Sequence, residues 1–410
     1  MKFLAEYRKI HSSFIYLFIA QFFIQLINAA FMQILLIYMD KLGYQDSQSA
    51  HFVSFRFLGI LLFSVPLGLY IKNHRIKPLF FIASIGIPVF SILIIISIQY
   101  RIYWLIYLSQ FFWGISLTFI QITILPFILR NSPKEHHVEA FTLSFSTMSL
   151  SIIVSGIFIF AFKSIFPTLY DEGLVMKIIA GIGCLNLIFV LLVNIDEKLP
   201  NQKSLNSSFL DYDWLLILKA LMPIILLGIG SGFTIPFVGL FFFKVHNIDS
   251  NHFAILSAFS TCMVFICYLY IPRINKLLGD RISIILTQSI AIILLAVMAF
   301  TEPYHHYSVA VFIAVACFVF RQPFMQMAMP LTTNLTMEYV GEKNQEIISA
   351  LQAAIWSGSW FISTNIFSFF RESGLDFFHI FLITALIYSF GVAWYYSLII
   401  ANQKKKLLES

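Results

Sequence analysis

The chain is a succession of apolar runs, each long enough to cross a lipid bilayer, separated by short polar segments. A membrane-spanning helix needs about 20 mostly apolar residues to cross a hydrocarbon core about 30 Å thick. Apolar runs bounded by charge, proline or glycine predict twelve such helices and thus an all-α membrane protein. The first six are expected at 13–37, 50–71, 79–99, 103–129, 140–165 and 175–195. The second six are expected at 214–243, 253–272, 282–301, 308–332, 347–370 and 377–400.

The composition excludes a water-soluble fold. Hydrophobic residues make up 59% of the 410 residues and charged residues only 11%, whereas soluble domains are roughly a quarter charged. Twelve crossings use about 240 residues, which leaves little for a soluble domain. The first run is too long for a signal-peptide core, and no small-residue cleavage site follows it, so we expect it to be retained.

The basic residues predict how the chain lies in the membrane. Of 26 Lys and Arg residues, 17 fall on the side of the termini, six fall on the opposite side and three lie within spans. Cytoplasmic loops carry an excess of Lys and Arg, so both termini are predicted in the cytoplasm, with a bacterial inner membrane as the expected location. The net charge of +6 is then a feature of membrane loops and gives no reason to expect a nucleic acid partner.

The longest predicted loop divides the spans six and six. It covers 196–213 (DEKLPNQKSLNSSFLDYD) and is expected to be a cytoplasmic linker between an N-terminal half, 1–195, and a C-terminal half, 214–410. The segment GYQDSQSAHF resembles NIDSNHF about 203 residues later, and Pro126 is matched by Pro330 at an offset of 204. The shared offset predicts two pseudo-symmetric six-helix halves that arose by duplication.

Together, twelve spans, a six-plus-six division, and a linker and termini on the cytoplasmic side resemble the major facilitator superfamily over nearly the whole chain. The family's signature loop after the second helix corresponds to GLYIKNHRIKPL, which keeps Gly68, Arg75 and Lys77 but has Lys72 where the family has Asp. The second-half loop, PRINKLLGDRISII, keeps the basic and Gly-Asp-Arg character with a different spacing. The resemblance implies alternating-access transport, with helices one, four, seven and ten around a central cavity.

Two departures weaken a drug-efflux interpretation. Drug-efflux members of the family carry an Arg in the fourth helix where this chain has Gln110. Their fifth-helix glycine series ends in Gly-Pro, whereas Gly156 is followed here by Ile157.

Two arginines lie within predicted spans, where a charge costs about 2.5–3.5 kcal/mol on insertion scales. Arg321 is about eleven residues from the nearer end of its span, roughly 16 Å and too deep for easy snorkelling. No Asp or Glu lies well inside any predicted span. We therefore predict that Arg321 contacts substrate or gates the pathway; the alternative is a bridge between helices through carbonyls and glutamines. Arg56, six residues into its span, is predicted either to snorkel to the outer surface or to serve gating or coupling.

A polar stripe runs along the first span, where Gln21, Gln25 and Asn28 share one helical face. The family architecture favours a cavity-facing position for this stripe, and interhelical contact is the alternative. The other predicted lining residues are Gln110, Gln121, Gln322 and Gln326, together with the aromatic Trp356. Acids near span ends are weaker candidates for gating or coupling: Asp40, Glu139 and Glu338.

No enzyme motif emerges from the sequence. The ten His residues lie in loops or near span ends, the four Cys lack metal-ligand spacing, and no nucleotide-binding glycine-rich loop is present. We expect no catalytic residues, no cofactor and no metal.

These observations predict a secondary active or facilitative transporter of a small polar solute, neutral or anionic, working by alternating access. The expected partners are a small-molecule substrate and the lipid bilayer, and the protein is expected to be a monomer. Three alternatives stay open: a proton antiporter exporting drugs or metabolites, a membrane-embedded enzyme acting on lipid-linked substrates, and a non-transporting sensor.

Overall fold

The computed structural model describes residues 12–131, 137–195, 197, 213–341 and 345–409, and within these ranges the regular structure is entirely helical. The helices of the first part of the chain are α2 (Ser12–Lys41), α3 (Asp46–Asn73), α4 (Lys77–Gln99), α5 (Tyr103–Gln121), α6 (Ile124–Asn131), α7 (His137–Ile165), α8 (Glu172–Gly183) and α9 (Asn186–Leu192). Those of the second part are α10 (Trp214–Thr234), α11 (Val238–His246), α12 (Ser250–Phe300), α13 (Ser308–Val340), α14 (Gln345–Glu372) and α15 (Phe377–Glu409). The predicted linker at 196–213, apart from its residues 197 and 213, lies outside the described residues.

These helices form twelve crossings, which confirms the predicted fold class. The pairs α5–α6, α8–α9 and α10–α11 each make one interrupted crossing, whereas α12 contains two. Pro126 lacks the amide hydrogen that would bond the Ile122 carbonyl, and Pro236 lies in the break between α10 and α11. Within α12, Gly279 has a φ of 73°, and this non-helical residue ends one crossing before the next begins.

Eleven segments of the described chain are long and apolar enough to cross a membrane. The twelfth crossing is α14, whose 28 residues span about 42 Å at about 1.5 Å per residue. Its residues include Gln352, Asn365 and several hydroxyl side chains, so it is more polar than the other spans. The sequence predicted this helix at 347–370, which is within two residues of its observed ends at Gln345 and Glu372.

The chain divides into two compact units. Unit 1 comprises Met1–Gln45, Phe52–Asn206 and Ser250–Ala258, and unit 2 comprises Asp46–His51, Ser207–Asp249 and Phe259–Ser410. Each unit includes one short segment from the other half of the sequence. The first turns of α3 belong by their contacts to unit 2, and the first turns of α12 belong to unit 1.

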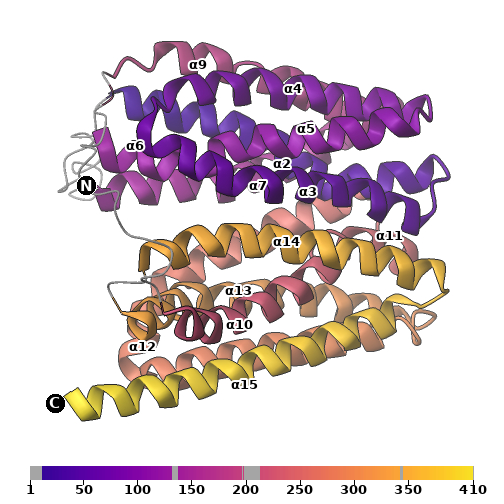
Figure 1. Cartoon of the computed structure of the whole chain (residues 1–410). Coiled ribbons are helices and arrows are strands. Elements are labelled where there is room, and N and C mark those ends of the chain that lie inside the picture. Colours follow the sequence, from indigo (N-terminus) through magenta and orange to yellow (C-terminus); the bar gives the residue numbers. More distant parts are fainter. Residues whose placement is uncertain (1–11, 132–136, 196, 198–212, 342–344, 410) are drawn as a thin grey trace. The chain divides into compact units, whose positions relative to one another are not determined.

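In unit 1, helix α2 is central and packs against α7, α8, α9 and α4, while α4 packs against α5 (Figure 1). The α2–α7 seam is polar and closely packed. Ser144 donates to Gln21 Oε1 at 3.0 Å, and Ser155 donates to Gln33 Oε1 at 2.9 Å. Near the linker, the Glu197 carboxylate accepts from the backbone N–H groups of Ile76 and Lys77, each at 2.6 Å, and so caps the start of α4.

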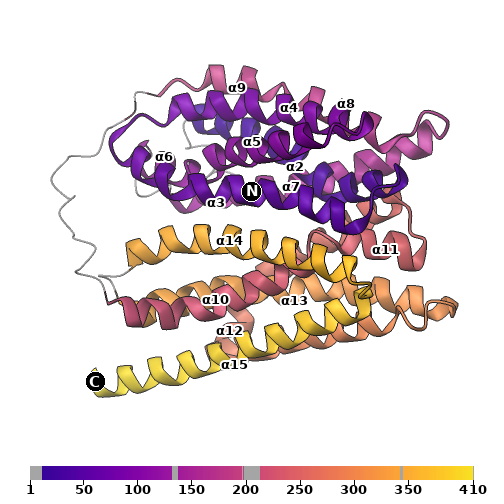
Figure 2. The same cartoon turned by 45° about the vertical axis from the view of Figure 1, so that its right-hand side comes forward.

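In unit 2, helix α10 lies between α14 and α15, as Figures 1 and 2 both show. Small residues allow this close packing. A Cβ at Gly228 would lie 2.8 Å from Ser359 Cβ, and one at Gly232 would lie 2.7 Å from Ser363 Cβ. This seam is the small-xxx-small pattern by which membrane helices approach each other closely.

Candidate substrate site

The guanidinium of Arg321 is buried in unit 2 without a carboxylate. The side chain lies on α13 and is 5% exposed. Its Nη2 donates to Thr234 Oγ1 at 3.5 Å, and its Cζ lies 6.0 Å from the centre of the Tyr388 ring. Among the described residues no Asp or Glu forms an ion pair with it. A fixed positive charge with weak, neutral partners is suited to receive an anionic or oxygen-rich ligand.

Gly230 on α10 gives Tyr388 the room to reach Arg321 and Thr234. A Cβ at Gly230 would lie 2.6 and 2.8 Å from two carbons of the Tyr388 ring. Tyr388 is 1% exposed, so its ring is enclosed by other residues. The sequence signal GIGSG at 228–232 marks these close approaches, but nothing in the sequence distinguishes Tyr388 from the other two tyrosines of the last span.

Replacing Gly230 by alanine is expected to lower the melting temperature in detergent. Overpacking costs about 1–3 kcal/mol, against about 1 kcal/mol gained by the better helix propensity of alanine. Gly391→Ala on α15 is the matched control, because its nearest neighbour would lie at an ordinary 3.4 Å, and it should be neutral or stabilising. Equal melting temperatures for Gly230→Ala and Gly391→Ala would contradict the tight contact.

The other predicted lining residues of unit 2 are partly buried. Gln322 accepts from Ser260 at 3.4 Å and Gln326 is half-buried. Trp356 is half-buried, and its ring centre lies 6.1 Å from that of Trp360. Trp360 in turn donates to Ser231 at 2.7 Å, which ties α14 to α10. Substrate contact by Gln322, Gln326 and Trp356 stays a prediction.

The polar stripe on α2 divides into two parts. Gln21 is 6% exposed and bonds Ser144 on α7, which supports the interhelical alternative for this residue. Gln25 is 3% exposed and accepts from Asn28 at 3.2 Å. Asn28 is half-buried, so it keeps some contact with the surroundings. The cavity-facing prediction therefore rests on Asn28 and Gln25.

The snorkelling interpretation of Arg56 is wrong, because the residue is 2% exposed and therefore does not reach the outer surface. It is buried in unit 1 and donates from Nε to Gln110 Oε1 at 3.2 Å. Gln110 is fully buried, whereas Gln121, at the end of α5, is exposed. A gating or coupling role of Arg56 stays a prediction.

The predicted coupling acids lie at helix ends. Asp40 is half-buried near the end of α2, and Glu338 is exposed and accepts from Asn334 at 3.0 Å and from Asn402 at 3.2 Å. Glu139 lies in the first turn of α7, and its side chain falls outside the part that the structure describes. Their roles stay predictions.

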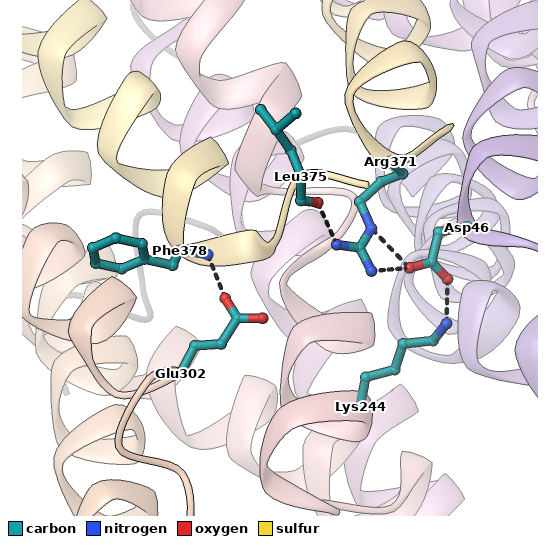
Figure 3. A network of polar contacts seen from close by, with 6 residues as sticks. All are labelled: Asp46, Lys244, Glu302, Arg371, Leu375 and Phe378. Atoms are coloured by element: carbon teal, nitrogen blue, oxygen red, sulfur yellow. Dashed lines mark hydrogen bonds and ion pairs between the residues drawn. The ribbon is translucent and has the colours of Figure 1, made fainter. Parts of the chain in front are cut away.

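A charge cluster that the sequence analysis missed surrounds Asp46 in unit 2 (Figure 3). Asp46 Oδ1 pairs with Lys244 Nζ at 2.6 Å, and Oδ2 accepts from Arg371 Nη2 at 2.8 Å and Nε at 3.0 Å. The Asp46 side chain is 5% exposed. Arg371 also donates to the Leu375 carbonyl at 2.6 Å. The cluster thus fastens the first turn of α3 to α11 and α14.

Unit 1 has a related cluster at the first turn of α12. Glu172 Oε1 pairs with Lys41 Nζ at 2.6 Å and accepts from Ser250 at 2.6 Å. Tyr170 and Ser250 share a hydrogen bond of 2.7 Å. Lys41 and Lys244 are 203 residues apart, the same separation as Asp46 and Asp249, so the repeat offset was the signal from which both clusters could have been found.

Glu302, also drawn in Figure 3, accepts from the backbone N–H of Phe378 at the start of α15. It follows the span that ends at Phe300. Burial raises the pKa of its carboxyl above the ordinary 4.5, and the nearby Asp376 charge raises it further, although the hydrogen bond and Arg371 oppose the rise. The folded protein therefore holds this proton at pH values where the unfolded chain releases it.

Because of this raised pKa, the free energy of unfolding should fall as pH rises from about 4.5 through the pKa of the folded state. In that window the unfolded chain binds fewer protons at Glu302 than the folded protein does. Glu302→Gln keeps an acceptor for Phe378 and removes the titration. Melting temperatures of both proteins should be measured across this pH window. The wild type should lose more stability than the variant, and parallel curves would contradict the assignment.

Within the described ranges, no group of three or more His, Cys, Asp or Glu is placed to hold a metal ion. The twelve-crossing architecture of two units, with a buried arginine in each, is that of a multi-pass integral membrane protein with a carrier-type fold. The model of the Major Facilitator Superfamily matches residues 17–364, and the chain belongs to this family.

Solved structures share the fold at low sequence identity. A bacterial homolog of the human lysosomal transporter Spinster, inward-facing and unoccupied, matches with a TM-score of 0.67 at 13% identity over 96% of this chain and 97% of that one. The nucleoside transporter NupG matches with a TM-score of 0.68 at 15% identity over 95% and 99%. The POT family transporter PepTSo matches with a TM-score of 0.76 at 9% identity over 97% and 99%. No curated protein sequence matches the chain.

Proposed function

We propose that the protein moves a small polar solute, neutral or anionic, across the membrane by alternating access and recognises it at Arg321. Membership of a transporter family supports the general activity. The observation that carries the choice of solute is the buried Arg321 guanidinium, held by Thr234 and near Tyr388, with no ion-paired carboxylate among the described residues. An organic cation would meet like charge there.

The proposed orientation has both termini in the cytoplasm of a bacterial inner membrane, with the protein acting as a monomer. The orientation is supported by the excess of Lys and Arg on the side of the termini. The connection between α14 and α15, where Glu372 and Asp376 are exposed, then faces away from the cytoplasm.

The test is exchange in proteoliposomes that contain the purified full chain. Radiolabelled neutral sugars, nucleosides, monocarboxylates, dicarboxylates and organic cations are tested with and without a proton gradient. We expect exchange of at least one neutral or anionic class and none of the cations. Exchange restricted to organic cations and driven by protons would favour the efflux antiporter and overturn the proposal.

A further inference from the structure

Arg56 is a second buried arginine without a counter-charge, and it lies in unit 1. Its Nε donates to Gln110 Oε1 at 3.2 Å, its Nη1 lies 3.5 Å from Met32 Sδ, and its Cζ lies 4.1 Å from the centre of the Trp113 ring. None of these partners carries a negative charge. Among the described residues no carboxylate forms an ion pair with Arg56.

The surroundings hold this guanidinium in place. Trp113 is fully buried, donates to Ser91 Oγ at 2.7 Å and stacks on Phe31 at 5.7 Å between ring centres. Helices α3 and α5 touch at this level, since a Cβ at Gly114 would collide with the Arg56 carbonyl oxygen. The backbone of α3 at Arg56 is therefore held against α5, and the Arg56 side chain is buried over the Trp113 ring.

Two buried donors at this position have no partner. They are Arg56 Nη2 and Gln110 Nε2, and neither has an acceptor among the residues that the structure describes. Rotating the Gln110 amide does not solve the problem, because its nitrogen would then face the Arg56 Nε–H, donor against donor. Nε and Nη2 form one edge of the guanidinium fork, so the N–H groups left over lie beside the Gln110 amide.

The physical cost of this arrangement calls for an anion. A guanidinium does not lose its proton in proteins, and a buried charge is stable only when it is paired and hydrogen-bonded. The Trp113 face and a thioether offset only part of that cost. An acceptor that carries negative charge would satisfy both N–H groups and the guanidinium charge together.

We propose that Arg56 and Gln110 bind a small monovalent anion in unit 1. The bound group is a halide or the carboxylate of a solute, since both offer compact negative charge to two N–H donors. Both residues of this site belong to unit 1, whereas the proposed solute contact at Arg321 belongs to unit 2.

The test measures melting temperatures of the purified full chain in detergent, at constant ionic strength, with gluconate replaced by chloride, bromide or acetate. We expect a saturable rise of at least about 2 °C with the small anions, because a ligand that binds only the folded state raises its stability. Arg281→Gln, which removes an exposed arginine of unit 2, is the control and should keep this response.

Gln110→Glu is the decisive variant, because it places a fixed carboxylate beside Arg56. It should melt at least as high as the anion-saturated wild type and lose the dependence on small anions. A wild type that melts equally in all four salts would overturn the proposal. A Gln110→Glu variant that responds to chloride as the wild type does would place the anion elsewhere and also overturn it.

The salt series separates the two sources of the anion. A rise with chloride and bromide but not with acetate identifies an inorganic halide. A rise with acetate that chloride does not exceed identifies a solute carboxylate, and transported monocarboxylates should then raise the melting temperature as well.

Discussion

Arg321→Gln should lower the rate of solute exchange about ten- to hundredfold while the protein still inserts into the membrane at normal levels. A hydrogen bond to a charged group contributes about 1.5–3 kcal/mol, and each 1.4 kcal/mol is about a tenfold change. Arg321→Lys should be less severe, because it keeps the charge and loses only the planar fork. Initial exchange rates in proteoliposomes, at equal reconstituted protein, measure the effect.

Arg281→Gln is the matched control for this experiment. Arg281 is an exposed arginine of unit 2 that also stacks on a tyrosine, with its Cζ 4.6 Å from the Tyr396 ring centre. It should exchange solute like the wild type. If Arg321→Gln instead melts markedly lower and its surviving protein transports normally, Arg321 is a structural bridge and the preference for anionic or oxygen-rich solutes loses its support.

Asp46→Asn should release the first turn of α3 from unit 2. The variant leaves Lys244 and Arg371 facing a neutral amide, and removing one partner of a largely buried ion pair costs up to about 3–5 kcal/mol. Lys244 and Arg371 keep side-chain exposures of 32% and 18%, so solvent lessens this cost. We expect a Cys introduced at Ser47, which is 9% exposed, to react at least about tenfold faster with a water-soluble thiol reagent when Asp46→Asn is also present.

This labelling is best done after the four native cysteines have been replaced by alanine. Asp213→Asn is the control: Asp213 is an exposed cap that accepts from Leu216 N at 3.1 Å, and Asn caps equally well. It should leave labelling of the Ser47 position unchanged. The same rate in the Asp46→Asn and Asp213→Asn backgrounds would show that the cluster does not hold α3.

Much of the fold follows from the sequence because a bilayer imposes few choices. Helices and closed β-barrels are the only structures that satisfy backbone groups in hydrocarbon, and a run of about 20 apolar residues fits a helix, since barrel strands are about 9–11 residues long. For this reason even α14, with its Trp and hydroxyl residues, was predicted within two residues of Gln345 and Glu372. The breaks after α5 and α10 were not predicted, although Pro126 and Pro236 are visible in the sequence.

The candidate site was less predictable, because side-chain partners depend on which helix faces which. The depth of Arg321 was readable from its distance to the span ends, but its neighbour Tyr388 lies 67 residues further along the chain, at a position that no local pattern distinguishes. The prediction placed Arg56 too near the surface. A side chain six residues into a span can snorkel only if no other side chains cover its face of the helix. Here Gln110 and Trp113 cover that face.

The charge on Arg321 also bears on how well the membrane keeps its ion gradients. A monovalent cation about 10 Å from the guanidinium meets an unfavourable energy of about 1.7 kcal/mol at an effective dielectric constant of about 20, which lowers its local concentration more than about tenfold. Fixed arginines exclude protons and metal cations from other membrane pathways in the same way. While no solute is bound, unit 2 should therefore be a poor route for leakage of sodium, potassium or protons.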